Sequence, residues 1–92
     1  MEFEWDPRKA AMNLRKHKVS FIEAATVFKD SFSITTPDPD HSENEDRSII
    51  VGMSDRTRLL IVSFADYGTR IRIISARTLT PTERRMYEEE NS

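Results

Sequence analysis

Three short segments dominated by Ile, Val and Leu most constrain the fold; they are RSIIVGMS (47–54), LLIVSFAD (59–66) and RIRIISAR (70–77). Runs of β-branched residues bounded by polar turns are typical of β-strands. The connections between them, SDRTR and Tyr67-Gly68-Thr69, are too short for a crossover helix, so neighbouring strands should run antiparallel. Together with SFSITT (31–36), which ends at Pro37, these segments predict a roughly four-stranded antiparallel meander.

The segments outside this meander begin with residues that cap helices. The three starts are Asp6-Pro7, Ser20 followed by Glu23, and Thr80-Pro81 followed by Glu83. Asp, Ser and Thr side chains accept hydrogen bonds from the first helical turn, and Pro needs no donor there. With FEW (3–5) as a short first strand, the order is β-α-α-β-β-β-β-α. This order predicts an α+β fold in which helices pack on one sheet.

The first helix, which Asp6-Pro7 opens and residues 8–18 continue, has an apolar face and an edge that carries a histidine. The residues at helical spacing on the predicted buried face are Pro7, Ala10, Ala11 and Leu14. His17 lies four residues after Asn13, so both side chains are expected on the same side of the helix, at the edge of this face.

Length and composition restrict the class of protein. A chain of 92 residues predicts a single domain, 1–92, whose last few residues we expect to be poorly ordered. The lack of Cys excludes disulfides and thiolate metal sites and agrees with a reducing compartment. No apolar run reaches membrane length, and MEFEWD does not resemble a signal peptide. We therefore expect a cytoplasmic protein that needs no membrane.

The shortage of Gly and His excludes several catalytic classes. Gly52 and Gly68 are the only glycines, so the chain cannot form the glycine-rich phosphate loops or nucleophile elbows of dehydrogenases, kinases and α/β-hydrolases. The only histidines are His17 and His41, and no HExxH motif is present. We predict no metal site and no cofactor, and we expect His41 to lie in a solvated loop.

Charges of opposite sign are segregated along the chain, although the net charge is only -2. Residues 8–18 hold five Lys or Arg residues and no acid, whereas residues 38–46 hold five Asp or Glu residues and no base. The chain ends on a second acidic run, 88–90. Such segregation predicts an anion-binding surface with acidic segments lying away from it. The role of the acidic loop 38–46 stays open.

Arginines alternate with isoleucines in the last predicted strand. Strict alternation divides it into Arg70, Arg72, Ile74 and Ala76 on one face and Ile71, Ile73, Ser75 and Arg77 on the other. Ile71 and Ile73 are expected to face the core, which leaves Arg72 on the open face of the sheet. Arg77 would then face the core unless the strand ends or bulges by Ser75, so we expect it at the rim.

These basic residues could support cleavage of RNA without a metal ion. An imidazole can exchange a proton near neutral pH, so His17 is suited to act as a general acid or base. Lys16 and the arginines would stabilise the extra negative charge of a pentacoordinate phosphate. Because RNA supplies the attacking 2′-hydroxyl itself, the protein needs only a proton-transfer group and cations.

Each of these residues also has a structural interpretation that the sequence leaves open. His17 could be a half-buried structural residue, and Arg72 could pair with Asp66 or Glu83 rather than with a ligand. The basic sides of the first and last helices could be merely solvated. Trp5 is expected to belong to the core rather than to a base-stacking surface.

The order of segments resembles the BrnT toxin family of bacterial type II toxin-antitoxin systems. The resemblance runs from Phe3 to about Tyr87, and its most specific pieces are WDPRKAAMNLRKHKVSF and IRIISAR followed by ERRMY. It implies a RelE-like ribonuclease fold and metal-independent cleavage of cellular RNA, as an endoribonuclease of the mRNA interferase type. It also implies a BrnA-like antitoxin with a ribbon-helix-helix domain. Promoter DNA would be bound and repressed only through this antitoxin. The resemblance is also compatible with a heterotetramer of toxin and antitoxin.

The resemblance also points to individual residues. It carries over Lys16, His17, Arg47, Arg72, Arg77 and Tyr87. With the other basic residues included, the residues expected to be catalytic are Lys16, His17, Arg72 and Arg77, and those expected to bind RNA are Lys9, Arg47, Arg84, Arg85 and Tyr87. The chain departs from the family pattern at Lys18, where glycine often follows the histidine. A left-handed residue at this helix end would be less favourable for Lys than for Gly.

Three functions compete at this point. The first is a ribonuclease toxin that uses His17 with Arg72 and Arg77 as phosphate clamps. The second is a non-catalytic co-repressor that binds its antitoxin, whose acidic or amphipathic segment would cover the basic face. The third is a plain RNA-binding domain, which the lack of paired aromatic residues on the sheet disfavours.

Overall fold

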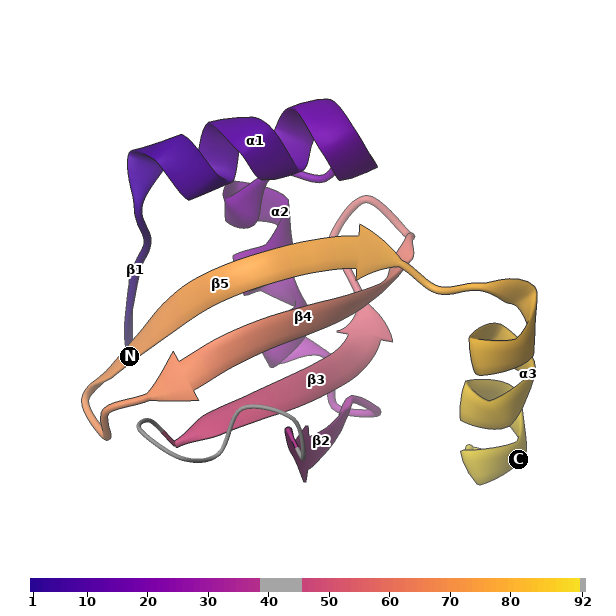
Figure 1. The fold of residues 1–92 in the computed structure, drawn as a ribbon. Helices are drawn as coiled ribbons and strands as arrows, with labels where there is room; N and C mark the ends of the chain where they lie inside the picture. The colour runs from indigo at the N-terminus through magenta and orange to yellow at the C-terminus, as the bar shows by residue number, and fades with distance from the viewer. Residues whose placement is uncertain (39–45, 92) are drawn as a thin grey trace.

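The structure is a computed structural model that describes residues 1–38 and 46–91 of the chain (Figure 1). Its elements are β1 (Glu2–Glu4), α1 (Pro7–His17), α2 (Phe21–Thr26), the 3₁₀ turn η1 (Val27–Lys29), β2 (Ile34–Pro37), β3 (Arg47–Met53), β4 (Leu59–Asp66), β5 (Arg70–Thr78) and α3 (Pro81–Glu90). Most of the predicted acidic loop, residues 39–45 with His41, lies outside the described residues, as does Ser92 in the C-terminal end.

In the described part of the chain, the strands form one five-stranded sheet in the order β1-β5-β4-β3-β2. The α+β class and the predicted order of elements are confirmed. The prediction of a roughly four-stranded, wholly antiparallel, RelE-like sheet is wrong in detail, because β1 adds a parallel edge strand to β5. A strand of three residues carries too little pattern to reveal a partner at the other end of the chain.

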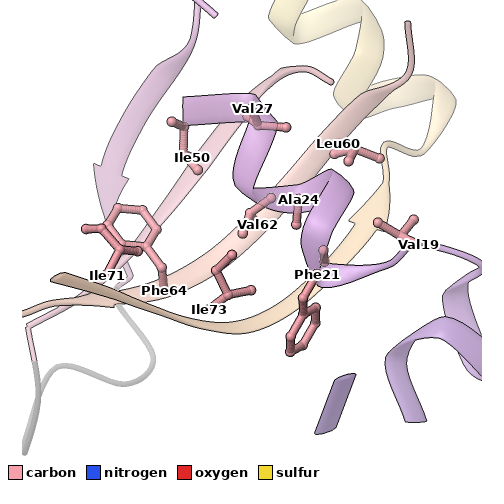
Figure 2. Close-up of a cluster of buried hydrophobic side chains, with 11 residues drawn as sticks. Val19, Phe21, Ala24, Val27, Ile50, Leu60, Val62, Phe64, Ile71 and Ile73 are labelled. Atoms are coloured by element: carbon pink, nitrogen blue, oxygen red, sulfur yellow. The ribbon is translucent and has the colours of Figure 1, made fainter. Parts of the chain in front are cut away.

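The core lies between the sheet and the segment that contains α2 (Figure 2). α2 lies behind the sheet, and α1 runs along β5 (Figure 1). Phe28 packs against two strands of the sheet, since its ring centroid lies 5.2 Å from that of Phe3 in β1 and 5.0 Å from that of Phe64 in β4. Trp5 packs edge-on against Phe21 at 6.0 Å, as expected for a residue of the core.

The buried face of α1 differs from the predicted apolar one. Asn13 is the buried residue of this helix, at 7% exposure, whereas Leu14 is 51% exposed and Ala10 is half-buried. The Asn13 amide nitrogen donates to the carbonyls of Val19 (3.0 Å) and Ala76 (2.7 Å), and its oxygen accepts from the Ala76 amide (3.1 Å). Three hydrogen bonds therefore allow a polar side chain to take the core position, which hydrophobic spacing could not indicate.

A β-bulge in β5 decides where its arginines point. Ser63 of β4 lies opposite Ser75, but its neighbour Phe64 lies opposite Ile73, so Ile74 has no opposite residue. The extra residue reverses the alternation, which keeps Ala76 in the core and turns Arg77 outward. A bulge by Ser75 was one of the two conditions, with an early end of the strand, under which Arg77 was expected at the rim rather than in the core.

Candidate nucleic-acid interface

A groove runs between α1 and the edge of β5. It consists of two adjoining hollows of about 400 and 260 Å³. The first is lined by Lys9, Met12, Asn13, Arg15, Lys16, His17, Ile74 and Ser75, and the second by Glu4, Trp5, Asp6, Lys9, Arg72, Ile73 and Ile74. Because Lys9 and Ile74 line both hollows, we treat them as one site, the α1–β5 groove.

The short length of β1 explains why this groove exists. β1 pairs with β5 through residues 70–72. Beyond Arg72 the edge of β5 faces α1, and the bulged Ile74 and the next residue, Ser75, form the floor. Asn13 fixes the distance between the two elements through its hydrogen bonds to Ala76.

Lys16 and His17 occupy the last turn of α1, next to Arg15. Cations are favourable there because the helix ends in unpaired carbonyl groups with partial negative charge. Lys9 lies two turns earlier on the same side of the helix, and all four side chains line the groove. His17 is half-buried at the groove wall, four residues after Asn13, as the sequence predicted.

The end of α1 is held by a half-buried ion pair between Arg58 and Glu23, which the sequence did not indicate. Lys18 closes the helix in the left-handed conformation (φ 61°), and its carbonyl accepts from Nη2 of Arg58 at 3.0 Å. Arg58 also pairs with the buried Glu23, and this hydrogen bond lowers the pKa of Glu23 despite its burial. Ser20 accepts from the Glu23 amide, so only half of the predicted capping box forms.

Arg72 enters the groove from the sheet and is oriented by Glu4. Nε of Arg72 donates to Oε2 of Glu4 at 3.0 Å, and Nε of Arg70 lies 2.9 Å from Oε1 of the same carboxylate. Both guanidinium carbons lie over the ring of Tyr67, at 5.6 Å and 4.8 Å from its centroid. The sequence suggested Asp66 or Glu83 as an acidic partner of Arg72. In the structure Arg72 pairs with Glu4, which lies nearby because β1 pairs with β5.

Arg47 belongs to the same cross-strand row as Arg72. Ala65 lies opposite Arg47 on one side and opposite Arg72 on the other. Residues directly opposite one another share a face of the sheet, so the two arginines flank Ala65 at roughly 10 Å from each other. Arg47 therefore lies outside the groove lining but extends its positive charge across the sheet.

The other predicted site residues belong to α3 or contact it, and they are not among the residues that line the groove. α3 follows β5 and lies apart from α1 (Figure 1). Arg77 forms two hydrogen bonds with Glu83, at 2.8 and 3.0 Å, and these lower the pKa of Glu83 to about 2. The hydroxyl of Tyr87 donates to the carbonyl of Phe32 at 3.3 Å, and burial raises the Tyr87 pKa. Arg84 pairs with an exposed acid one turn later, and Arg85 is exposed.

Within residues 1–38 and 46–91, no three His, Asp or Glu side chains gather as metal ligands. In the same residues, no helix combines the length and the apolar character that crossing a membrane requires.

Comparisons with known proteins agree with this architecture. Residues 5–83 match the family described as the ribonuclease toxin BrnT of type II toxin-antitoxin systems. No curated protein matches the chain in sequence. Its fold is similar to that of the Brucella abortus ribonuclease toxin BrnT, solved at 1.1 Å: the TM-score is 0.69 at 22% identity, over 87% of this chain and 97% of that one. The chain therefore belongs to the BrnT family of ribonuclease toxins.

Proposed function

We propose that this chain is a metal-independent endoribonuclease toxin of the mRNA interferase type, which cleaves cellular RNA in the cytoplasm at the α1–β5 groove. The observation that carries the proposal is the convergence of Lys9, Lys16, His17 and Arg72 on this one groove. Lys9, Lys16 and His17 come from α1 and Arg72 comes from β5, so segments far apart in the sequence supply the four side chains. Membership of a ribonuclease toxin family supports the same reaction class.

In the proposed reaction, the 2′-oxygen of a nucleotide attacks the adjacent phosphorus, and the bond from phosphorus to the 5′-oxygen breaks. One proton leaves the 2′-hydroxyl and another reaches the departing 5′-oxygen, which leaves a 2′,3′-cyclic phosphate and a 5′-hydroxyl. His17 transfers one of these protons, which is worth roughly 10²–10⁴-fold in rate. Lys16 and Arg72 stabilise the charge that develops on the phosphate oxygens.

The remaining predicted residues receive other roles in this proposal. Arg47 continues the positive track beyond the groove and binds the RNA backbone. Arg77 and Tyr87 hold α3, since their polar atoms contact Glu83 and Phe32. Arg84 and Arg85 are proposed as outer RNA contacts on the same helix.

Incubation of the purified protein with a labelled RNA in EDTA tests the proposal. We expect products that end in 2′,3′-cyclic phosphate, and no cleavage of the same strand with 2′-deoxy nucleotides. His17→Ala and Arg72→Ala should fold normally and cut about 10²-fold more slowly or worse. Arg56→Ala is the matched control, because Arg56 is exposed in the turn between β3 and β4. This variant should cleave RNA at the rate of the parent. Unchanged rates in both groove variants would refute these roles.

A non-catalytic co-repressor is the second candidate. The observation that favours it is that Glu4 pairs with Arg72 and Glu83 pairs with Arg77, so two predicted phosphate clamps have acidic partners within the chain. In either case, the family implies an antitoxin partner. We propose a ribbon-helix-helix antitoxin of the BrnA type, which binds the promoter DNA and forms a heterotetramer with the toxin. Loss of all RNA cleavage in the free protein, with intact repression in the complex, would favour the co-repressor.

A further inference from the structure

A separate hollow, of about 190 Å³, lies between α3 and the face of the sheet opposite the core. Its lining is mainly apolar and includes Ile34, Val51 and Ile61 from the sheet with Leu79, Met86 and Tyr87 from the α3 segment. We call it the α3 groove. Ile34 lies opposite Val51, and Val51 lies opposite Ile61, so the floor is one apolar row across β2, β3 and β4.

Polar contacts hold the α3 wall of this groove in place. The helix has no fully buried residue, and Met86 is 63% exposed. Its start is fixed by the two hydrogen bonds between Arg77 and Glu83 and by the capping box of Thr80. Its last turns are tied to the segment before β2 by the Tyr87 hydroxyl. The helix therefore presents an apolar side next to an apolar floor in a preformed arrangement.

The charged side chains of this lining are both acidic. Glu83 is neutralised by Arg77, and Glu90 lies at the C-terminal end of α3, where the helix dipole adds partial negative charge. An occupant that suits this groove has apolar side chains for the floor and a Lys or Arg side chain opposite Glu90. An acidic segment, which the sequence suggested for the basic face, does not suit this one.

We propose that the α3 groove binds an apolar, basic segment of the antitoxin and so anchors that partner away from the α1–β5 groove. The proposal rests on the proposed function only in taking the antitoxin as the partner. A second copy of this chain suits the groove less well. Two copies joined groove to groove would face each other with linings whose charged side chains are all acidic, so neither copy would offer Glu90 a Lys or Arg side chain.

Fluorescence anisotropy with two synthetic helical peptides tests this proposal on the whole chain. Both peptides carry Leu at helical spacing; one has Lys at the remaining positions and the other has Glu. We expect the Lys peptide to bind and the Glu peptide to bind at least about tenfold more weakly. Glu90→Lys should reverse this preference, which non-specific attraction to other acids would not do.

Substitutions of exposed apolar residues locate the binding site. Met86→Asp should weaken the Lys peptide about tenfold, whereas Ile22→Asp, at a 71% exposed position on α2, should change its affinity less than twofold. Equal effects of the two variants, or absence of Lys-peptide binding, would overturn the proposal. Self-association of the parent protein that is lost in Met86→Asp would also overturn the proposal, because a second copy of the chain would then occupy the groove. RNA cleavage should persist in Met86→Asp, so failure here is distinguishable from failure of the proposed ribonuclease.

Discussion

Glu4 and Arg72 lie directly opposite each other on the parallel strands β1 and β5, and the carboxylate of Glu4 accepts from Nε of Arg72 at 3.0 Å. The same carboxylate contacts Arg70, so one acid at the start of the chain orients two arginines near its end. Glu4 has two opposing effects on a bound phosphate. It lowers the positive charge of the groove, and it holds the Arg72 guanidinium in one direction.

Substitution of Glu4 should therefore separate RNA binding from RNA cleavage. In Glu4→Gln, we expect a 2′-deoxy analogue to bind several-fold more tightly and single-turnover cleavage of RNA to slow by about tenfold. The control is Asp55→Asn, which removes an exposed acid from the turn between β3 and β4 and should leave both quantities near those of the parent. Parallel changes in binding and cleavage would show that Glu4 does not position Arg72.

Removal of the Asn13 side chain should destabilise the packing of α1 on β5. Asn13→Ala leaves the amide and carbonyl of Ala76 without their side-chain partner in a buried position, and each unsatisfied group costs about 1–3 kcal/mol. We expect the free energy of unfolding, measured with urea, to fall by about 2–4 kcal/mol. Asn13→Asp should be similarly harmful, because a carboxylate cannot donate to a carbonyl.

An exposed neighbour provides the control for Asn13. Met12→Ala removes a side chain that is 64% exposed and should change the free energy of unfolding by less than about 0.5 kcal/mol. If Asn13→Ala proved as mild as Met12→Ala, the hydrogen bonds to Ala76 would not hold the two elements together.

Replacement of Lys18 by glycine should stabilise the protein. Lys18 has a φ of 61°, a conformation that costs an L-residue roughly 1–2 kcal/mol and glycine much less. After the larger entropy of an unfolded glycine is subtracted, we expect Lys18→Gly to raise the free energy of unfolding by about 0.5–1 kcal/mol. Lys18→Ala removes the same charge but keeps a Cβ, so a gain of the same size in that variant would contradict the backbone explanation.

The pair of Arg77 and Glu83 should make stability depend on pH. Because the pKa of Glu83 is lowered from 4.5 to about 2, its ionised form stabilises the folded state above pH 4.5, and this effect is lost as the pH falls towards 2. We expect Glu83→Gln to lower the Tm at pH 7 and most of that difference to vanish near about pH 2.5. Glu90→Gln should change the Tm little at either pH, and a Glu83→Gln difference that does not depend on pH would rule out this linkage.

Some features of this protein follow from short stretches of sequence. The starts of α1, α2 and α3 were predicted from Asp6-Pro7, Ser20 and Thr80-Pro81, because a helix cap depends on residues within one turn. The three central strands were predicted from runs of β-branched residues bounded by polar turns, which are also short local patterns. His17 and Lys16 were predicted at a helix end and lie there, although their catalytic role stays a proposal.

Only the tertiary structure decided which side chains meet. The pairing of β1 with β5 brings Glu4 to Arg72, and neither strand carries a local signal for that partner. The bulge at Ile74 turns Arg77 towards Glu83 and α3, which separates it from the groove that Arg72 enters. Local chemistry thus determines where helices and strands begin and end, whereas the grouping of charges depends on hydrogen-bonded register between distant segments, which no short pattern encodes.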